Sequence, residues 1–263
     1  MNIKHLYKGK KVLGFWLLLA GWLVFPATSY GQDWQFRISL AEESYKDGNY
    51  PEAISRYKSI ADSGYVSGEL LYNIGNACYK NRDIPSAILY YERASRYLPH
   101  DEDIRFNLEL ARLNTQDKID TLNPFFLKVW IFWVRDLMSE SAWGKLNIVC
   151  LFLTLGAVLT FLLSGWPEVR KWSLSIFSLA LFVFLLSLWM GNLQKNNLQR
   201  TDEAIVFSPS VTVKSSPDDS GTNLFVLHEG TKVLILDQIG EWREIRLSDG
   251  NRGWIRISEL EII

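Results

Sequence analysis

The sequence predicts a multi-domain membrane protein that combines an α-helical repeat solenoid, a two-helix transmembrane hairpin and a small all-β barrel. Three observations predict this architecture. A set of residues recurs at a fixed offset of 34 positions, two long apolar runs follow it, and short β-rich runs separated by turn residues end the chain. The 263 residues are enough for two small domains or one large one, and a net charge of −1 gives no sign of a nucleic-acid partner.

Residues 1–31 predict a signal peptide. Lysines at positions 4, 8, 10 and 11 precede the apolar run 12–24, which Pro26 ends before a stretch of small residues suited to cleavage. An uncleaved membrane anchor is the alternative. Both interpretations place residue 33 onward outside the cytoplasm.

The region 33–116 carries a repeat. Six residues recur after 34 positions, which pairs Tyr45 with Tyr79, Lys46 with Lys80, Pro51 with Pro85, Ala53 with Ala87, Ile54 with Ile88 and Tyr57 with Tyr91. A period of this length with small residues at fixed positions is typical of stacked helix–turn–helix units. Both prolines suit the first turn of a helix, where a missing N–H costs nothing, and Gly48 suits a turn between helices.

The pattern resembles the tetratricopeptide repeat. In the second copy the residues on the family's signature positions are Leu71, Ile74, Gly75, Cys78, Ala87, Tyr91, Ala94 and Pro99, with Leu71 in place of the usual Trp and Cys78 in place of the usual aromatic. The resemblance implies two full repeats. A capping helix is expected within 101–116, with Asp101 as its N-cap and Ile104, Leu108 and Ala111 on one face.

In that family the inner face of the first helix of each pair binds extended peptides or partner helices. The resemblance therefore implies a partner-binding groove formed by Tyr45, Tyr72, Asn76, Tyr79, Lys80 and Phe106, with Ile38, Glu42 and Leu110 on equivalent positions. The alternative is that these side chains are ordinary core residues or part of a solvated face.

Residues 120–142 are dense in aromatic side chains and are interrupted by Lys128, Arg135 and Asp136. The segment is too charged and too short to span a bilayer, so it predicts a helix that lies along the membrane interface. A loop packed on the repeats is the alternative.

Residues 143–193 predict a transmembrane hairpin with spans at 146–165 and 172–193. Neither span contains a charged residue, and each is long enough to cross about 30 Å of hydrocarbon at about 1.5 Å per residue. Tryptophans at positions 143, 166, 172 and 189 lie at or near the ends of the spans, as interfacial residues do. Because no ionisable residue lies within the spans, the pattern favours anchoring over transport.

A hairpin places both flanking regions on one side of the membrane. The signal peptide places that side, with the repeats and the barrel, outside the cytoplasm. In a bacterium this is the periplasmic side of the inner membrane. Arg170 and Lys171 would then lie in a cytoplasmic turn. The opposite orientation is favoured by the cations that flank the other side, which are Lys128, Arg135, Lys145, Lys195 and Arg200.

The C-terminal region 203–263 resembles the bacterial SH3-like domain. The resemblance is carried by the Lys-Ser-Ser-Pro loop at 214–217, the His-Glu-Gly-Thr turn at 228–231, Trp242, and Gly253-Trp254-Ile255. The apolar residues expected in its core are Val211, Val213, Leu227, Val233, Ile235, Trp242, Ile245, Trp254 and Ile255. Trp242 and Trp254 are also the candidates for an exposed ligand face. The two tryptophans are therefore either core residues of the barrel or part of a surface that binds a ligand.

The sequence gives no indication of catalysis, metal or cofactor. It lacks a Gly-rich phosphate loop, ligands at metal-binding spacing, and a Ser/His/Asp set within one region. Cys78 and Cys150 are too few for a disulfide framework, and His5, His100 and His228 lie far apart. We therefore expect a protein that is not an enzyme.

The order of these regions resembles, along the whole chain, the BatE-like member of the Bat aerotolerance proteins, which joins tetratricopeptide repeats to an SH3-like domain. The resemblance implies a membrane-anchored scaffold or adaptor of the bacterial envelope, with other Bat-type membrane proteins and a MoxR-type AAA+ ATPase as protein partners. The alternative is a cell-wall protein whose barrel binds peptidoglycan.

Overall fold

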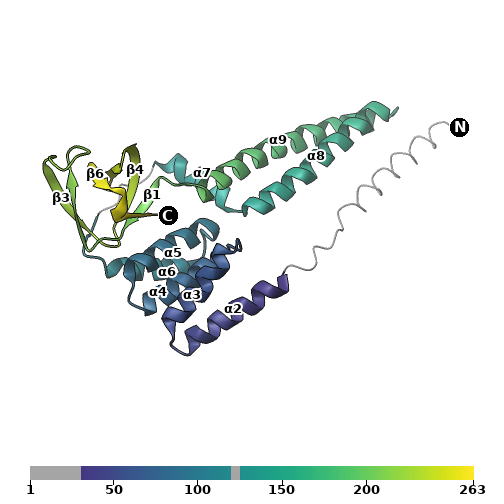
Figure 1. The fold of residues 1–263 in the computed structure, drawn as a ribbon. Coiled ribbons are helices and arrows are strands. Elements are labelled where there is room, and N and C mark those ends of the chain that lie inside the picture. Colours follow the sequence, from purple (N-terminus) through teal and green to yellow (C-terminus); the bar gives the residue numbers. More distant parts are fainter. Residues whose placement is uncertain (1–30, 120–124) are drawn as a thin grey trace. The chain divides into compact units, whose positions relative to one another are not determined.

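A computed structural model of the chain describes residues 31–119 and 125–263 (Figure 1). The signal peptide predicted at residues 1–31 lies outside the described residues, apart from the last of them. The described chain divides into two compact units. One comprises residues 130–196, and the other comprises residues 31–119, 125–129 and 197–263.

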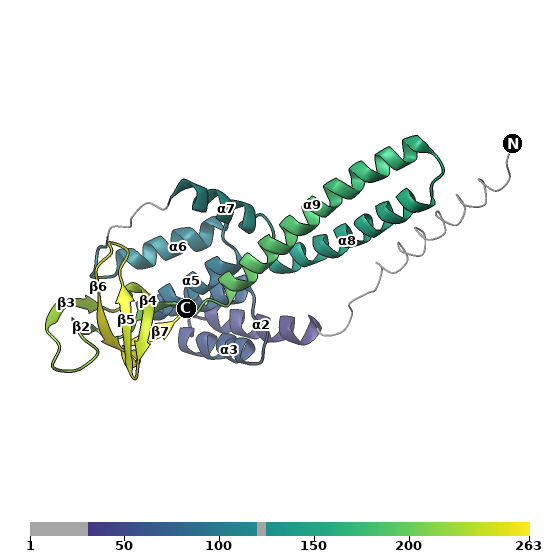
Figure 2. The same cartoon turned by 90° about the horizontal axis from the view of Figure 1, so that it is seen from above.

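The N-terminal region consists of paired helices. In chain order they are α2 (Gly31–Lys46), α3 (Tyr50–Asp62), α4 (Gly68–Lys80), α5 (Ile84–Tyr97) and α6 (Glu102–Leu113). Each helix packs on the next one, and the α4–α5 and α2–α3 pairs are the most extensive (Figures 1 and 2).

Local sequence explains where these helices begin. A polar side chain accepts a hydrogen bond from a backbone N–H of the first turn in four of them, with Asn49 capping α3, Ser67 capping α4, Asp83 capping α5 and Asp101 capping α6. Pro51 and Pro85 lie in the first turn, as predicted. Gly48 has a φ of +77°, so it takes the left-handed conformation that the turn after α2 requires.

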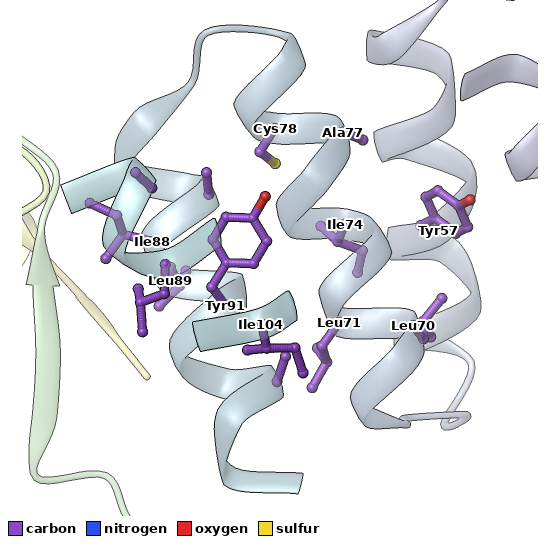
Figure 3. Packing of buried hydrophobic residues seen from close by; sticks show 14 of the residues in the cluster. Tyr57, Leu70, Leu71, Ile74, Ala77, Cys78, Ile88, Leu89, Tyr91 and Ile104 are labelled. Carbon is purple, nitrogen blue, oxygen red and sulfur yellow. The ribbon is translucent and has the colours of Figure 1, made fainter. Parts of the chain in front are cut away.

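Buried side chains between the helices form one core (Figure 3). Tyr57 and Tyr91, which the sequence relates by the 34-residue offset, are both fully buried in it. Gly75 is required by close packing: a Cβ at this position would lie 2.6 Å from Cδ1 of Tyr91. The three residues expected on one face of the capping helix, Ile104, Leu108 and Ala111, are buried as well.

Two long apolar helices follow the short helix α7 (Phe126–Asp136). They are α8 (Glu140–Leu163) and α9 (Pro167–Leu198), and both are long and apolar enough to cross a membrane by length and composition. α9 extends beyond both ends of its predicted span. α8 begins before its predicted span, where Ser139 caps it by accepting a hydrogen bond from the N–H of Ala142, and it ends at Leu163, short of the predicted end, because Ser164 is extended. α7 has no buried residue.

Several hydroxyl side chains within the two long helices bond to the backbone of their own helix. The hydroxyl of Thr154 donates to the carbonyl of Cys150 at 2.7 Å, and that of Thr160 donates to the carbonyl of Gly156 at 2.8 Å. Ser187 does the same with Phe184 at 2.9 Å. These hydroxyl groups can therefore lie in an apolar environment without leaving a hydrogen bond unmade.

The C-terminal region is a seven-stranded antiparallel sheet with the order β3-β2-β6-β5-β4-β1-β7 (Figure 2). Its strands are β1 (Glu203–Val206), β2 (Ser210–Lys214), β3 (Asn223–His228), β4 (Lys232–Ile239), β5 (Trp242–Arg246), β6 (Arg252–Arg256) and β7 (Leu260–Ile262), with a 3₁₀ turn, η1 (Ile257–Glu259), before β7. The strands fall within the β-rich region 203–263 expected from the sequence. β7 has only three residues, and its pattern is too short to recognise.

The sheet has its own core, but the two predicted tryptophans lie outside it. Val213, Leu227, Val233, Ile245 and Ile255 are buried in the core, and Val211 and Ile235 pack against it. Trp242 and Trp254 are half-buried and are not part of this core. Successive side chains of a strand point to opposite faces of the sheet. Ile245 lies an odd number of residues from Trp242 and Ile255 an odd number from Trp254, so the isoleucines point into the core and the tryptophans point away from it.

Candidate functional site

The predicted groove residues meet in a pocket on the paired helices. Its volume is about 290 Å³, and its lining consists of Tyr45, Tyr72, Asn76, Tyr79, Lys80, Tyr91, Asn107 and Leu110. Tyr45 comes from α2, four residues come from α4, Tyr91 comes from α5, and the last two come from α6. Five of the six residues proposed from the sequence therefore share one pocket.

Asn76 is the centre of the polar contacts in this pocket. Its Oδ1 accepts a hydrogen bond from the hydroxyl of Tyr91 at 2.8 Å and another from Nδ2 of Asn107 at 3.1 Å. Nδ2 of Asn107 also donates to the hydroxyl of Tyr72 at 2.8 Å. These bonds tie α4 to both α5 and α6, and they hold the two tyrosine hydroxyls in fixed positions.

Packing of the tyrosine rings explains why the pocket exists at this place. The Tyr91 ring lies against Gly75, where no side chain competes for the space. The ring centroids of Tyr72 and Tyr91 are 5.9 Å apart, and the rings are tilted by 44°. Such tilted aromatic pairs are favourable arrangements.

Burial makes the pocket tyrosines harder to ionise than free tyrosine, which is already uncharged at neutral pH. It raises the pKa of the Tyr45, Tyr72 and Tyr91 hydroxyls above the ordinary value, although the hydrogen bond with Asn76 acts in the opposite direction at Tyr72. Neutral hydroxyls both donate and accept hydrogen bonds, as do asparagine amides. The pocket thus offers neutral polar groups and aromatic surface, with the exposed Lys80 as its one cation.

Phe106 is not part of the pocket. Its side chain is 65% exposed, while Asn107 and Leu110 of the same helix reach the lining. At about 100° per residue, position 110 lies between positions 106 and 107 around the helix. The pocket meets the side of α6 that carries Asn107 and Leu110, and Phe106 lies beyond its edge. Asn107 was missed by the sequence analysis, and the repeat gave no signal for it, because its equivalent 34 residues earlier, Asn73, does not line the pocket.

Trp242 and Trp254 lie on the outer face of the sheet. In the β5–β6 ladder Trp242 is opposite Arg256 and Trp254 is opposite Glu244. The guanidinium of Arg256 lies 5.3 Å from the centroid of the Trp242 ring. The face therefore combines aromatic surface with a cation that also binds Asp219 at 2.7 Å.

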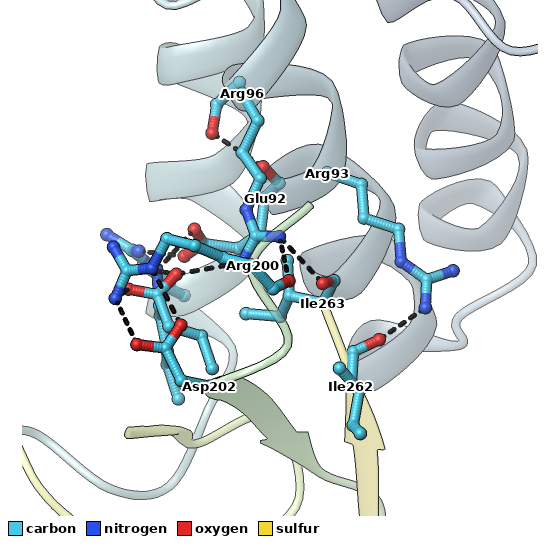
Figure 4. Close-up of polar contacts among 11 residues, drawn as sticks. Glu92, Arg93, Arg96, Arg200, Asp202, Ile262 and Ile263 are labelled. Atoms are coloured by element: carbon cyan, nitrogen blue, oxygen red, sulfur yellow. Dashed lines mark hydrogen bonds and ion pairs between the residues drawn. The ribbon is translucent and has the colours of Figure 1, made fainter. Parts of the chain in front are cut away.

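A cluster of charged residues joins the paired helices to the sheet within the same unit (Figure 4). Glu92 of α5 is only 7% exposed and binds the side chains of Arg112 and Lys232. Burial alone would raise the pKa of the Glu92 carboxyl, but the two cations outweigh it and hold this pKa below its ordinary value.

The neighbouring Arg96 extends this cluster to the end of the chain. Its guanidinium donates to Glu203 at 3.1 Å, to the carbonyl of Arg200 at 2.9 Å and to the carbonyl of Ile263 at 2.8 Å (Figure 4). Ile205 and Ile263 belong to the same core as the helices. The sequence carried no signal for these contacts, since their partners lie more than 100 residues apart.

A second polar contact lies where the chain leaves α6. The carboxylate of Asp117 accepts hydrogen bonds from the backbone N–H of His228 at 2.8 Å and from the hydroxyl of Thr231 at 2.7 Å, and it contacts Nδ1 of His228 at 2.8 Å. Burial acts to raise the pKa of Asp117, but these hydrogen bonds lower it below the ordinary value. His228, expected as an ordinary turn residue, thus has a defined partner.

Comparison with known proteins gives no relative to report. No protein-family model matches this sequence, and a search of curated proteins finds no significant match. Among residues 31–119 and 125–263, no group of three His, Cys, Asp or Glu side chains is arranged to hold a metal ion.

Proposed function

We propose that this chain is a non-enzymatic, membrane-anchored scaffold of the bacterial envelope, in which the paired helices bind a protein partner. The observation that carries the proposal is the pocket formed by Tyr45, Tyr72, Asn76 and Tyr79. Its neutral hydroxyl and amide groups match the donors and acceptors of a polypeptide backbone, and its aromatic rings match apolar side chains.

The proposal assigns a role to each region. The paired helices are a tetratricopeptide array, α8 and α9 are a transmembrane hairpin, and the sheet is an SH3-like barrel on the periplasmic side of the inner membrane. The support is the 34-residue repeat, the two helices of membrane-crossing length and the order of the β-rich runs. Other Bat-type membrane proteins and a MoxR-type ATPase are the proposed partners, from the resemblance of the sequence.

Affinity purification from detergent-solubilised membranes tests the scaffold. We would compare the natural chain with the double variant Tyr72→Lys/Tyr79→Lys and identify bound proteins by mass spectrometry. Two added ammonium groups in the pocket are expected to abolish recovery of the partner. Phe36→Lys is the matched control, because Phe36 is 62% exposed on α2 and does not line the pocket. Equal recovery from all three proteins would refute the scaffold.

A second candidate is a cell-wall protein that binds peptidoglycan through the sheet. It is favoured by Trp242 and Trp254, which lie half-exposed on one face as sugar-stacking residues would. The test is co-sedimentation of the detergent-solubilised full chain with purified sacculi, with and without Trp242→Ala/Trp254→Ala. Tryptophan-dependent sedimentation would support this candidate, whereas a chain that stays in the supernatant would exclude it.

A further inference from the structure

Two arginines lie directly opposite each other at one end of the β5–β6 ladder. Arg246 of β5 is paired with Arg252 of β6. Like charges in this position destabilise a sheet. Among the ion pairs between residues of the described chain, none includes either arginine. The pair therefore carries an uncompensated positive charge.

Other cations and a hydroxyl surround this pair. Arg246 and Arg252 line a hollow together with Arg200, Lys232, Ser248 and Gly250. Gly250 has a φ of +99° and a Cβ there would meet nothing within 4 Å, so the hairpin leaves the hollow open at this point.

Two of the nearby carboxylates make their contacts with other residues. Glu203 also lines the hollow, and it binds Arg96 at 3.1 Å, Lys232 at 3.1 Å and Arg200 at 3.4 Å. Asp249, in the hairpin between β5 and β6, accepts hydrogen bonds of 2.9 Å from the backbone and the side chain of Asn251. Neither carboxylate forms an ion pair with Arg246 or Arg252 in the described chain, so both guanidinium groups are available to an anion from outside the chain.

We infer that this hollow binds the phosphate group of an anionic lipid headgroup. Guanidinium groups bind phosphate oxygens through paired N–H donors, and the Ser248 hydroxyl supplies a further donor. A phosphate diester has acceptor oxygens for several such groups at once. A phosphate bound between the two guanidinium groups would also offset the repulsion between Arg246 and Arg252.

The connection to α9 selects lipid as the source of the phosphate, and this step rests on the proposed membrane anchoring. Arg200 follows the last residue of α9, Leu198, by two positions. Only four residues, 199–202, connect α9 to β1, and at about 3.5 Å per residue they reach about 15 Å. A sheet on so short a connection stays close to the headgroup layer of any membrane that α9 crosses. Anionic lipids attract cationic side chains within about 10 Å of the headgroup layer, and Arg200, two residues beyond α9, lies at the membrane end of this connection.

The test uses the full chain in a neutral detergent. Binding of short-chain phosphatidylglycerol is titrated, with short-chain phosphatidylcholine, inorganic phosphate and an acidic peptide as the other probes. The variant is Arg246→Gln/Arg252→Gln. The control is Lys46→Gln/Arg105→Gln, which removes the same charge from exposed positions on α2 and α6.

We expect saturable binding of phosphatidylglycerol that the Arg246→Gln/Arg252→Gln variant weakens at least about tenfold and the control leaves unchanged, with no saturable binding of phosphatidylcholine. The variant should melt at a higher temperature than the natural chain in the absence of lipid, because the repulsion is gone. If the double variant does not fold, the single variant Arg252→Gln replaces it in the lipid titration.

Three results would overturn the inference: equal lipid affinity in variant and natural chain, inorganic phosphate that binds as tightly as the lipid, or an acidic peptide that binds more tightly than the lipid. Extraction of membranes with alkaline carbonate keeps the two proposals apart. A chain released into the soluble fraction contradicts membrane anchoring. A chain that stays in the membrane but binds lipid independently of the arginines contradicts the lipid site alone.

Discussion

The ammonium group of Lys232 lies 2.9 Å from the carboxylate of Glu92 and joins strand β4 to helix α5, although 140 residues separate them in the chain. Arg112 of α6 binds the same carboxylate. One buried acid therefore holds together two helices and the sheet. A partner bound on the helices would consequently be held in a fixed position relative to the sheet.

Glu92→Gln should destabilise this unit. The substitution removes the charge that compensates Arg112 and Lys232, and we expect the free energy of unfolding to fall by about 2 kcal/mol. Urea unfolding of the full chain in mild detergent, followed by circular dichroism, measures the change. Glu109→Gln is the control, because Glu109 is an exposed residue of α6. If the two variants unfold at the same urea concentration, the cluster contributes no stability.

Stability should decrease in acid because of Glu92 and Asp117. Both carboxyl groups have a lower pKa in the folded protein than their ordinary value, so the folded form binds fewer protons than the unfolded chain. Their stabilisation is complete only above a pH of about 5, where both groups are also ionised in the unfolded chain, and it is lost as the pH falls through the folded pKa values. Thermal unfolding between neutral and acidic pH checks this, and Glu92→Gln/Asp117→Asn should show the smaller loss. An identical pH profile for this variant would contradict the assignment.

Gly75→Ala should disturb the pocket through packing alone. A methyl group at this position would lie 2.6 Å from Cδ1 and 2.7 Å from Cε1 of Tyr91, so the ring must move. We expect a loss of about 1–3 kcal/mol in the free energy of unfolding, as for other overpacked cores. Gly144→Ala is the control, because a Cβ on this residue of α8 meets nothing within 4 Å. Equal melting temperatures of the two variants would show that the Tyr91 ring adapts without cost.

The hydrogen bond between Tyr91 and Asn76 should appear as a coupling energy. Asn76→Ala leaves the buried hydroxyl of Tyr91 without its acceptor and should cost about 1–2 kcal/mol, whereas the same substitution in a Tyr91→Phe background should cost less. A double-mutant cycle from urea unfolding gives the difference, expected at about 1 kcal/mol. Additive effects of the two substitutions would mean that the bond contributes nothing.

Much of the local structure follows from the sequence because it depends on neighbouring residues. The 34-residue repeat indicated the paired helices, and the prolines and polar caps indicated where α3, α5 and α6 begin. The long uncharged runs indicated α8 and α9, since composition over about 20 residues decides whether a helix suits a membrane. The short β-rich runs separated by turn residues indicated the β region at the end of the chain.

The shape of the pocket was only partly visible in the sequence. Equivalent repeat positions named Tyr45, Tyr72, Asn76 and Tyr79, but the rotation of α6 about its axis brought Asn107 to the pocket instead of Phe106. That rotation depends on how Ile104, Leu108 and Ala111 pack against the other helices, which is a property of the assembled core.

Charge pairing between distant segments was decided by the tertiary structure alone. Nothing in the sequence selects Lys232 for Glu92, or places Arg246 opposite Arg252, because long-range ion pairs and strand register depend on packing across many residues. Apolar periodicity is repeated many times along a chain and can be recognised from one sequence. An ion pair between two distant residues occurs once in the chain and has no repeated pattern. Which residue pairs with which is therefore known only from the folded structure.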